Sequence, residues 1–384
     1  MKKVKIFVAA LAAAVVAISF AACGEKCASG HSYGEWTVTV AATCTEDGTE
    51  TRKCSVCDKE ETRPIAKLGH DYGDPVYAER DGKLVTVRKC SRCDVEDVKE
   101  VENGVAVRTW DELATAVKTN NAYIVLMNDI AKVGANDLGL RPYGADHSIT
   151  IDLNGKTIAS RISARTAWDG VKDCGFNLTV KILNGNVGTA DGYVADVKDA
   201  ANVIAYAIMI NGGRVNLTIE KVNMIGYYGG FYTNGSNAGS TATISNSAIK
   251  GVKGGASYLA GGHTVTFDNC EFEGGFGLYI KSGTVTLNDC AVRATGAYEQ
   301  PNYNGNGADG GGSGIVVDSV KGYNIESLTF VMNRGSIVSA NGYAFEQVVT
   351  KGDNYSTSTL DGVSMTAGKD QNVFVTTEGA VTVR

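Results

Sequence analysis

The stretch Ala242–Ala294 decides the fold, because it contains three copies of one short pattern. The copies read Ala242-Thr-Ile-Ser-Asn-Ser-Ala-Ile-Lys-Gly251, Val265-Thr-Phe-Asp-Asn-Cys-Glu-Phe-Glu-Gly274 and Val285-Thr-Leu-Asn-Asp-Cys-Ala-Val-Arg-Ala294. Each copy is a short strand with period-two alternation, followed by a polar turn. A unit this short cannot bury its apolar face alone, whereas stacked copies can. The pattern predicts an all-β solenoid of parallel strands.

Related segments extend the solenoid in both directions along the chain. Before the three copies come Ile149–Gly155, Leu178–Gly185 and Leu217–Asn223, and after them come Leu328–Met332 and Ser358–Gly362. A second family of short strands alternates with these segments, at Ile208–Asn211, Phe231–Asn234, Ser257–Ala260, Leu278–Lys281, Ile315–Asp318, Ala344–Gln347 and Val373–Thr376. Two strands per coil are what a right-handed parallel β-helix requires.

A short amphipathic helix is expected just before the first coil. Thr109 and Glu112 have the spacing of a capping box, and Trp110, Leu113 and Val117 then share one face. A helix here suits the N-terminal cap that covers the open end of a solenoid. The helix and the Leu-Asn-Gly segments resemble the pectate-lyase-like β-helices of bacterial surface proteins. The resemblance covers about 105–384 and implies a right-handed parallel β-helix, which we assign to 104–384. It leaves the chemistry open, because that architecture serves lyases, hydrolases and adhesins alike.

Residues 31–103 form a duplicated, cysteine-rich segment, for which we expect a small β module. Arg52-Lys-Cys54-Ser-Val-Cys57-Asp58 recurs as Arg88-Lys-Cys90-Ser-Arg-Cys93-Asp94. The segment resembles short Cys/His repeats of surface proteins in gut Firmicutes, and the role expected of it is structural. The second unit has no counterpart of Cys44.

Structural zinc, disulfides and free thiols are the three alternatives for these cysteines. A Cys-x-x-Cys turn grips zinc, and Cys44 with His70 would complete a Cys₃His site around Cys54 and Cys57. Cys90 and Cys93 can form a second site with His31. An exported module also permits disulfides, although the nine cysteines that follow Cys23 are an odd number and cannot all pair within one chain.

The first 22 residues have the features of a lipoprotein signal peptide. A basic start is followed by an apolar run from Ile6 to Phe20 and by small residues before Cys23. This order resembles a bacterial lipobox, which implies lipidation of Cys23; ordinary cleavage after an alanine is the alternative. We expect residues 23–30 to be a tether and the protein to be lipid-anchored on the extracellular face of a bacterial cell membrane.

Charge narrows the range of partners. The formal net charge is −6, and no cluster of Lys and Arg is large enough for a nucleic-acid footprint. A glycan or another cell-surface component fits this composition better.

One column of the second strand family has the composition of a ligand face. Alternation points Tyr232, Tyr258 and Tyr279 outward, beside a polar column that includes Asn234, Lys281 and Asp318. Aromatic rings can cover sugar faces while polar groups meet hydroxyls or a uronate carboxylate. These six residues are the predicted binding site. The competing interpretation is that a long loop covers the column and makes it ordinary core.

Enzymatic activity is the less favoured prediction. A β-helix lyase uses a basic residue beside carboxylates that hold calcium, for which Lys281, Arg293, Asp289 and Asp318 are the candidates. They form no known signature, and the motifs of β-helix hydrolases are missing from the sequence. We therefore predict a non-catalytic binding protein, with a polysaccharide lyase or hydrolase acting on acidic glycans, or a structural spacer, as alternatives.

Overall fold

The computed structural model describes residues 27, 30–132, 137–194, 202–234, 238–298, 310–320, 327–351, 355–376 and 381–384. The predicted signal peptide and Cys23 lie outside these residues. Two compact units are present, one built from residues up to Val76 together with Val87–Val98, the other from Tyr77–Thr86 together with Lys99–Arg384. No helix in the described ranges is long and apolar enough to cross a membrane.

The cysteine-rich segment forms two three-stranded sheets, one per repeat, as the duplication predicts. Their orders are β1-β2-β3 and β4-β5-β6. The strands are β1 (Thr37–Val40), β2 (Gly48–Lys53), β3 (Glu60–Ile65), β4 (Val76–Arg80), β5 (Lys83–Lys89) and β6 (Glu96–Glu100).

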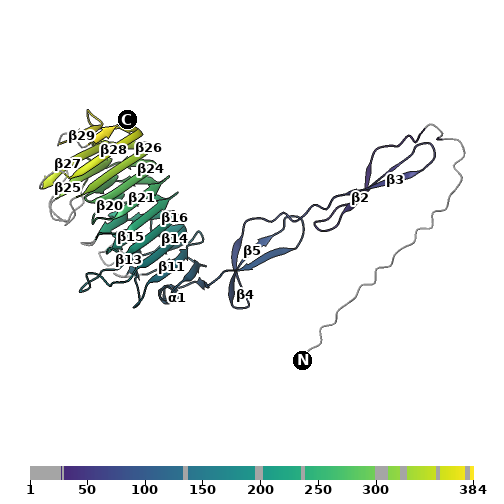
Figure 1. The fold of residues 1–384 in the computed structure, drawn as a ribbon, viewed down its shortest axis with the longest axis horizontal. Coiled ribbons are helices and arrows are strands. Elements are labelled where there is room, and N and C mark those ends of the chain that lie inside the picture. Colours follow the sequence, from purple (N-terminus) through teal and green to yellow (C-terminus); the bar gives the residue numbers. More distant parts are fainter. Residues whose placement is uncertain are drawn as a thin grey trace, which may run out of the picture. The chain divides into compact units, whose positions relative to one another are not determined.

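The remainder of the chain is a parallel β-helix, so the predicted all-β solenoid is confirmed. Figure 1 shows its strands stacked side by side from β11 near the helix α1 to β28 at the C-terminal end. Nine strands form one sheet: β10 (Asp137–Leu140), β13 (Arg161–Arg165), β15 (Tyr206–Asn211), β17 (Gly229–Asn234), β20 (Ser257–Leu259), β23 (Leu278–Ile280), β25 (Ile315–Val320), β27 (Phe345–Lys351) and β29 (Val373–Val375). These strands are the predicted second family, preceded by β10 and β13.

Fifteen strands form the other sheet of the solenoid. They are β7 (Gly104–Val107), β8 (Ala122–Leu126), β9 (Ile130–Ala131), β11 (His147–Asp152), β12 (Thr157–Ala159), β14 (Leu178–Gly188), β16 (Val215–Gly226), β18 (Thr241–Ser245), β19 (Ala248–Gly251), β21 (Thr264–Asp268), β22 (Glu271–Gly274), β24 (Gly283–Ala294), β26 (Leu328–Ser339), β28 (Ser356–Thr366) and β30 (Val381–Val383). Strands in contact are parallel, as the coil of a solenoid requires.

The register confirms the alignment of the three copies. Ala242 pairs with Val265, and Val265 pairs with Val285, so each copy lies directly on the next. Two residues further on, Phe267 and Leu287 are fully buried. Stacking therefore places like residues in one interior column, and each coil buries the apolar face of its neighbour.

The polar turn of the pattern has a conformational cause. Asn246, Asn269 and Asp289 have φ values of 50°, 51° and 52°. Asn and Asp tolerate this left-handed conformation better than other residues with a side chain, because their short polar groups can hydrogen-bond locally. The side chains also join successive coils, since Asn269 Nδ2 donates to Asn246 Oδ1 at 2.8 Å. The Asn/Asp column thus bends each coil.

The predicted cap is present as α1 (Trp110–Ala116). Thr109 Oγ1 accepts a hydrogen bond from the backbone N–H of Glu112, and the Glu112 side chain accepts one from the backbone N–H of Thr109. Leu113 and Val117 are buried against the first coils, while Trp110 is half-buried. The helix thus covers apolar residues at the start of the solenoid, where no preceding coil exists.

Candidate metal centres and ligand-binding pocket

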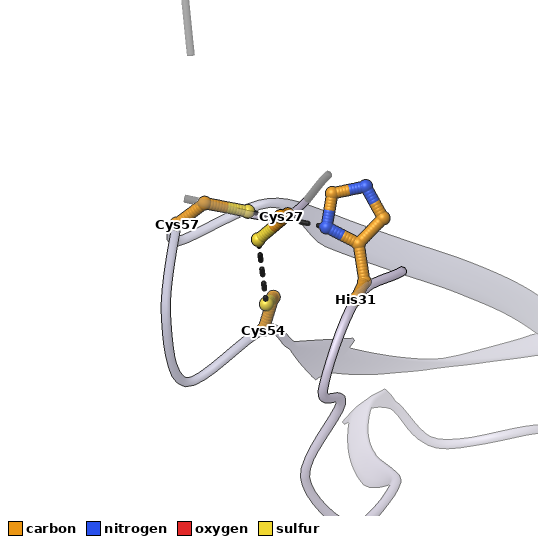
Figure 2. Close-up of side chains that lie close together, drawn as sticks. All are labelled: Cys27, His31, Cys54 and Cys57. Atoms are coloured by element: carbon orange, nitrogen blue, oxygen red, sulfur yellow. Dashed lines mark hydrogen bonds between the residues drawn. The ribbon is translucent and has the colours of Figure 1, made fainter. Parts of the chain in front are cut away.

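Four side chains from the first repeat converge at a tight turn. Cys27, His31, Cys54 and Cys57 each offer one ligand atom, and these atoms all lie within 4.8 Å of one another. Figure 2 shows the Cys27 and Cys54 thiols and the His31 ring directed toward a common point. Cys27 Sγ is 3.9 Å from Cys54 Sγ, and Cys57 Sγ is 3.2 Å from His31 Nδ1. We call this cluster site A.

The same arrangement recurs in the second repeat. Cys44, His70, Cys90 and Cys93 also bring their ligand atoms within 4.8 Å of one another. Cys44 Sγ is 3.8 Å from Cys90 Sγ, and Cys93 Sγ is 3.3 Å from His70 Nδ1. We call this cluster site B. Both sites therefore have three sulfur ligands and one imidazole nitrogen.

The duplicated sequence builds both sites with the same local backbone. Tyr33 forms an antiparallel bridge with Cys54, and Tyr72 forms the corresponding bridge with Cys90. Each bridge holds the segment that begins with the histidine against the strand that leads into the Cys-x-x-Cys turn. The spacing His-x-Tyr thereby fixes the imidazole beside the two thiols.

The backbone favours a thiolate in each cluster. A hydrogen bond from the backbone of Val56 contributes most to lowering the pKa of Cys54 to about 6, against the effect of burial. Burial raises the pKa of Cys90, but it is outweighed by hydrogen bonds from the N–H groups of Arg92 and Asp71, each 3.4 Å from its Sγ, together with those of the His70 and Cys93 side chains, so the pKa is lowered to about 6. The thiolate is the form that binds a metal, and one thiol in each site is favoured in that form. The opposite holds for Cys27, whose pKa is raised to about 12 chiefly by a hydrogen bond with Cys57, and for Cys44, whose pKa is raised to about 12 chiefly by burial.

The distances fit a metal ion better than a disulfide. A metal held about 2.3 Å from two sulfurs in tetrahedral geometry places those sulfurs about 3.8 Å apart, whereas a disulfide needs about 2.05 Å. The two sulfur pairs, Cys27 with Cys54 and Cys44 with Cys90, are separated by 3.9 and 3.8 Å, which is too far for a disulfide bond. Both clusters can therefore hold a metal ion.

The structure corrects the predicted ligand grouping. Cys54 and Cys57 belong to site A, whereas Cys44 and His70 belong to site B. The reason is that β2 spans six residues between the loop that carries Cys44 and the turn that carries Cys54, which is about 20 Å of extended chain. Cys27 was assigned to the tether, although its place four residues before His31 was a usable signal.

The predicted aromatic ligand face is stacked but covered. Tyr232 and Tyr258 stack with ring centroids 5.0 Å apart, and Tyr258 and Tyr279 stack at 6.0 Å. Tyr258 is only 5% exposed and Tyr279 is fully buried, while Tyr232 is half-buried. Phe276 packs in the same cluster. This column is core over most of its length, as the competing interpretation expected; the side chain of Asn234 lies outside the described residues.

A buried charged group lies next to this column. Lys281 and Asp318 are both fully buried. The hydroxyl of Tyr279 donates a hydrogen bond to Asp318 Oδ2 at 2.7 Å, and Lys281 Nζ lies 5.0 Å from the centre of the Tyr279 ring. Burial lowers the pKa of Lys281, and the charge of Asp318 opposes that shift. Sequence reasoning brought these two residues together correctly but placed them on an exposed face.

The other two lyase candidates lie on the other sheet. Arg293 and Asp289 are exposed on β24, and Asp289 forms an ion pair with Arg334 at 2.5 Å. Arg293 lines an outward groove of about 440 Å³ across β19, β22, β24 and β26. Inside it, Lys250 and Glu273 form an ion pair at 2.6 Å, so two of its charges already satisfy each other.

A pocket that sequence reasoning missed lies beside the capping helix. Its volume is about 380 Å³, within the usual range of small-molecule sites. Aromatic rings and cations line it together: Trp110, Tyr143, Trp168, Lys118, Lys132, Arg141 and Arg165. We call it the cap pocket. Trp110 lies in α1 and Arg165 ends β13, while the others come from segments after α1, β9, β10 and β13, so only the coiling of the chain brings them together.

Contacts between rings and cations organise the cap pocket. Arg141 Cζ lies 5.6 Å from the ring centre of Tyr143 and 5.5 Å from that of Trp168. Lys132 Nζ lies 5.8 Å from the ring of Trp110. These cation–π contacts hold positive charge at the ring faces, where a ligand could meet both.

The acidic residue of the pocket is already neutralised. Asp137 pairs with Arg161 at 3.2 Å and also with Arg165. Nε of Arg165 is buried without a hydrogen-bond partner in the structure. The pocket therefore keeps an excess of positive charge on a chain whose net charge is negative.

Comparison with protein-family models, with curated proteins and with solved structures found no significant match. The functional argument therefore rests on the residues and the geometry of this chain.

Proposed function

We propose that the chain is a non-catalytic surface protein whose β-helix binds an acidic glycan in the cap pocket. The observation that carries this proposal is the set of three aromatic rings and four cationic side chains that line one cavity. Rings offer flat apolar contact to a sugar ring, and guanidinium groups pair with carboxylates in bidentate geometry. A uronic-acid unit presents both of these features.

The electrostatics of the pocket favour an acidic sugar over a neutral one. Arg141 is exposed and held between two rings, so its donors can reach a ligand that stacks there. Arg165 also lines the pocket, and its guanidinium already pairs with Asp137, so Arg141, Lys118 and Lys132 carry the charge that remains for a ligand. A carboxylate is a partner that satisfies both charge and hydrogen bonding.

The metal proposed for sites A and B is zinc in a structural role. Cys₃His sets are a common structural zinc environment, and the sulfur separations support tetrahedral geometry. The first repeat also needs such a staple. Among residues 30–76, the apolar side chains that are buried are Cys44 and Cys54, which are themselves ligands. Metal binding would thus replace the hydrophobic core that this small sheet lacks.

Anchoring at a bacterial cell surface completes the proposal. It is supported by the sequence before residue 24, where a basic and then an apolar segment lead to Cys23. A lipid on Cys23 would hold the protein at the extracellular face of the membrane, with the two repeats between anchor and β-helix in the chain.

The runner-up function is a polysaccharide lyase acting on acidic glycans. One observation favours it: burial lowers the pKa of Lys281, as in a lysine that serves as a base. Calcium would then be a required cofactor. The burial of Lys281 and Asp318 in the same aromatic cluster favours a structural role instead.

A single screen separates these functions. The full chain is applied to an array of acidic and neutral glycans, and the same glycans are incubated with it and calcium while ultraviolet absorbance is followed. Binding to uronic-acid glycans without an unsaturated product supports the proposal. Formation of that product establishes the lyase, and the absence of both results supports a spacer.

A further inference from the structure

The cysteine that completes site B comes from the first repeat, although the other three residues of the site belong to the second. Cys44 lies in the loop between β1 and β2, inside the first repeat, whereas His70, Cys90 and Cys93 belong to the second. Site A takes its corresponding ligand, Cys27, from the chain just before the first repeat. Each site is therefore completed by a cysteine from the segment that precedes its own repeat.

The backbone around this cysteine is the same in both sites. In site A, the N–H of Gly30 donates to the carbonyl of Cys27 at 3.1 Å. In site B, the N–H of Gly69 donates to the carbonyl of Cys44, also at 3.1 Å. Each glycine directly precedes the ligand histidine and has a positive φ, of 116° and 70°. The same glycine-to-cysteine hydrogen bond thus joins residues 3 positions apart in site A and 25 positions apart in site B.

The loop of the first repeat is shaped for this contact. The N–H of Leu68 donates to the carbonyl of Thr43 at 2.8 Å, next to the Gly69 bond. The guanidinium of Arg92, inside the Cys-x-x-Cys turn of site B, donates to the carbonyl of Leu68 at 2.9 Å. These bonds hold the loop against the linker that enters the second repeat, and they aim Cys44 at Cys90.

The corresponding loop of the second repeat cannot act in this way. Between β4 and β5 the chain turns at Asp81 and Gly82, with φ values of 52° and 74°, and carries no cysteine. Positive φ at both residues is typical of a tight two-residue hairpin turn. The second repeat therefore has no loop cysteine that could complete a further site.

From this geometry we infer that the metal in site B is a staple between the two repeats, which fixes their relative orientation. The inference rests on metal binding at both sites. Cross-linking through a metal restricts the accessible conformations as a covalent bridge does. Site A stabilises the first repeat, and site B converts two tethered repeats into one rigid unit.

Double electron–electron resonance on the full chain tests this inference, with zinc as the only added metal. Spin labels are attached through a ketone-bearing amino acid, which leaves the cysteines unmodified. One pair, at Val38 and Val56, reports on the first repeat alone; a second pair, at Val56 and Val98, spans the two repeats. All three positions are exposed.

In the wild-type chain both distance distributions should be narrow, and two zinc ions should bind. Cys44→Ser should bind one zinc and broaden only the distribution between the repeats. Thr45→Ala, in the same loop, is the matched control and should behave as wild type. Cys44→His, which restores a ligand, should recover the second zinc and the narrow distribution.

Three results would overturn the inference. Two bound zinc ions with an unchanged distribution between the repeats in Cys44→Ser would show that Cys44 links nothing. Equal broadening of both pairs in that variant would show that Cys44 acts on the first repeat. The absence of bound zinc in the wild-type chain would remove the metal assignment as well, while leaving glycan binding to its own test.

Discussion

Replacing Asp318 alone with alanine should destabilise the β-helix far more than removing both charges in the double variant Lys281→Met/Asp318→Asn. Both residues are fully buried, and Asp318 accepts a hydrogen bond from Tyr279 at 2.7 Å. Removing only the carboxylate leaves a buried ammonium without this counter-charge, which costs about 3–5 kcal/mol, and the lost hydrogen bond adds about 1 kcal/mol. We therefore expect Asp318→Ala to lower the free energy of unfolding by about 4–6 kcal/mol.

Methionine at position 281 keeps the volume and removes the charge. Because burying a pair of charges gains little over well-packed apolar groups, the double variant Lys281→Met/Asp318→Asn should unfold within about 2 kcal/mol of wild type. Urea denaturation followed by tryptophan fluorescence measures all variants. A loss below about 1 kcal/mol in Asp318→Ala would refute the reasoning. A loss in the double variant that exceeds the loss in Asp318→Ala would also refute it.

The buried Lys281 should also make the free energy of unfolding depend on pH, in a direction that follows from its pKa. Burial lowers the pKa of Lys281 from its ordinary value of 10.5, so between the two values the unfolded chain binds more protons at this site than the folded chain. Stability relative to Lys281→Met should therefore rise with pH across that interval. If the difference in the free energy of unfolding between wild type and Lys281→Met fell or stayed constant over this pH interval, burial of the ammonium would be contradicted.

Three further perturbations test other parts of the account. Trp168→Ala should weaken binding of a uronic-acid oligosaccharide by about 30-fold in calorimetry, since a ring at the centre of a site contributes about 2 kcal/mol; the exposed Tyr228→Ala is the control and should bind normally. Asn269→Val should cost about 1–2 kcal/mol in urea denaturation because its φ is 51°, whereas Asn269→Gly should cost less than valine. Chelation of zinc should make residues 30–76 sensitive to protease while the β-helix stays resistant, and equal cleavage with and without chelator would contradict the metal staple.

The coils of the solenoid were predictable because their signal is local and repeated. Period-two alternation fixes which residues face inward, and recurrence of Ala242, Val265 and Val285 at one point of the pattern fixes the register. The left-handed turn at Asn269 was visible as a polar column, although its conformation was not inferred.

The binding face was not predictable in the same way. Alternation showed that Tyr258 and Tyr279 leave the interior of the coil, but it cannot show what lies over them. Their burial depends on residues of later coils, such as Val316 and Val348, which pack in the same cluster. The cap pocket escaped prediction for a related reason, since Trp110, Arg141 and Trp168 have no common spacing along the chain.

The metal centres were half predictable. The Cys-x-x-Cys turns and both histidines were identified from the duplication, and their convergence is local. The assignment of Cys44 failed because it depends on which end of the hairpin β1–β2 faces the next repeat. Only the contact of that loop with Leu68 and Gly69 decides it.

Binding of a uronic-acid oligosaccharide to the full chain, compared with its neutral counterpart of the same length, tests the central claim most directly. Isothermal titration calorimetry at low and at high ionic strength measures the affinity for each of the two oligosaccharides. The account predicts binding of the acidic oligosaccharide alone, with an affinity that falls as salt screens the charges of Arg141 and its neighbours. Equal affinity for both oligosaccharides, or an affinity that Trp168→Ala leaves unchanged, would contradict it.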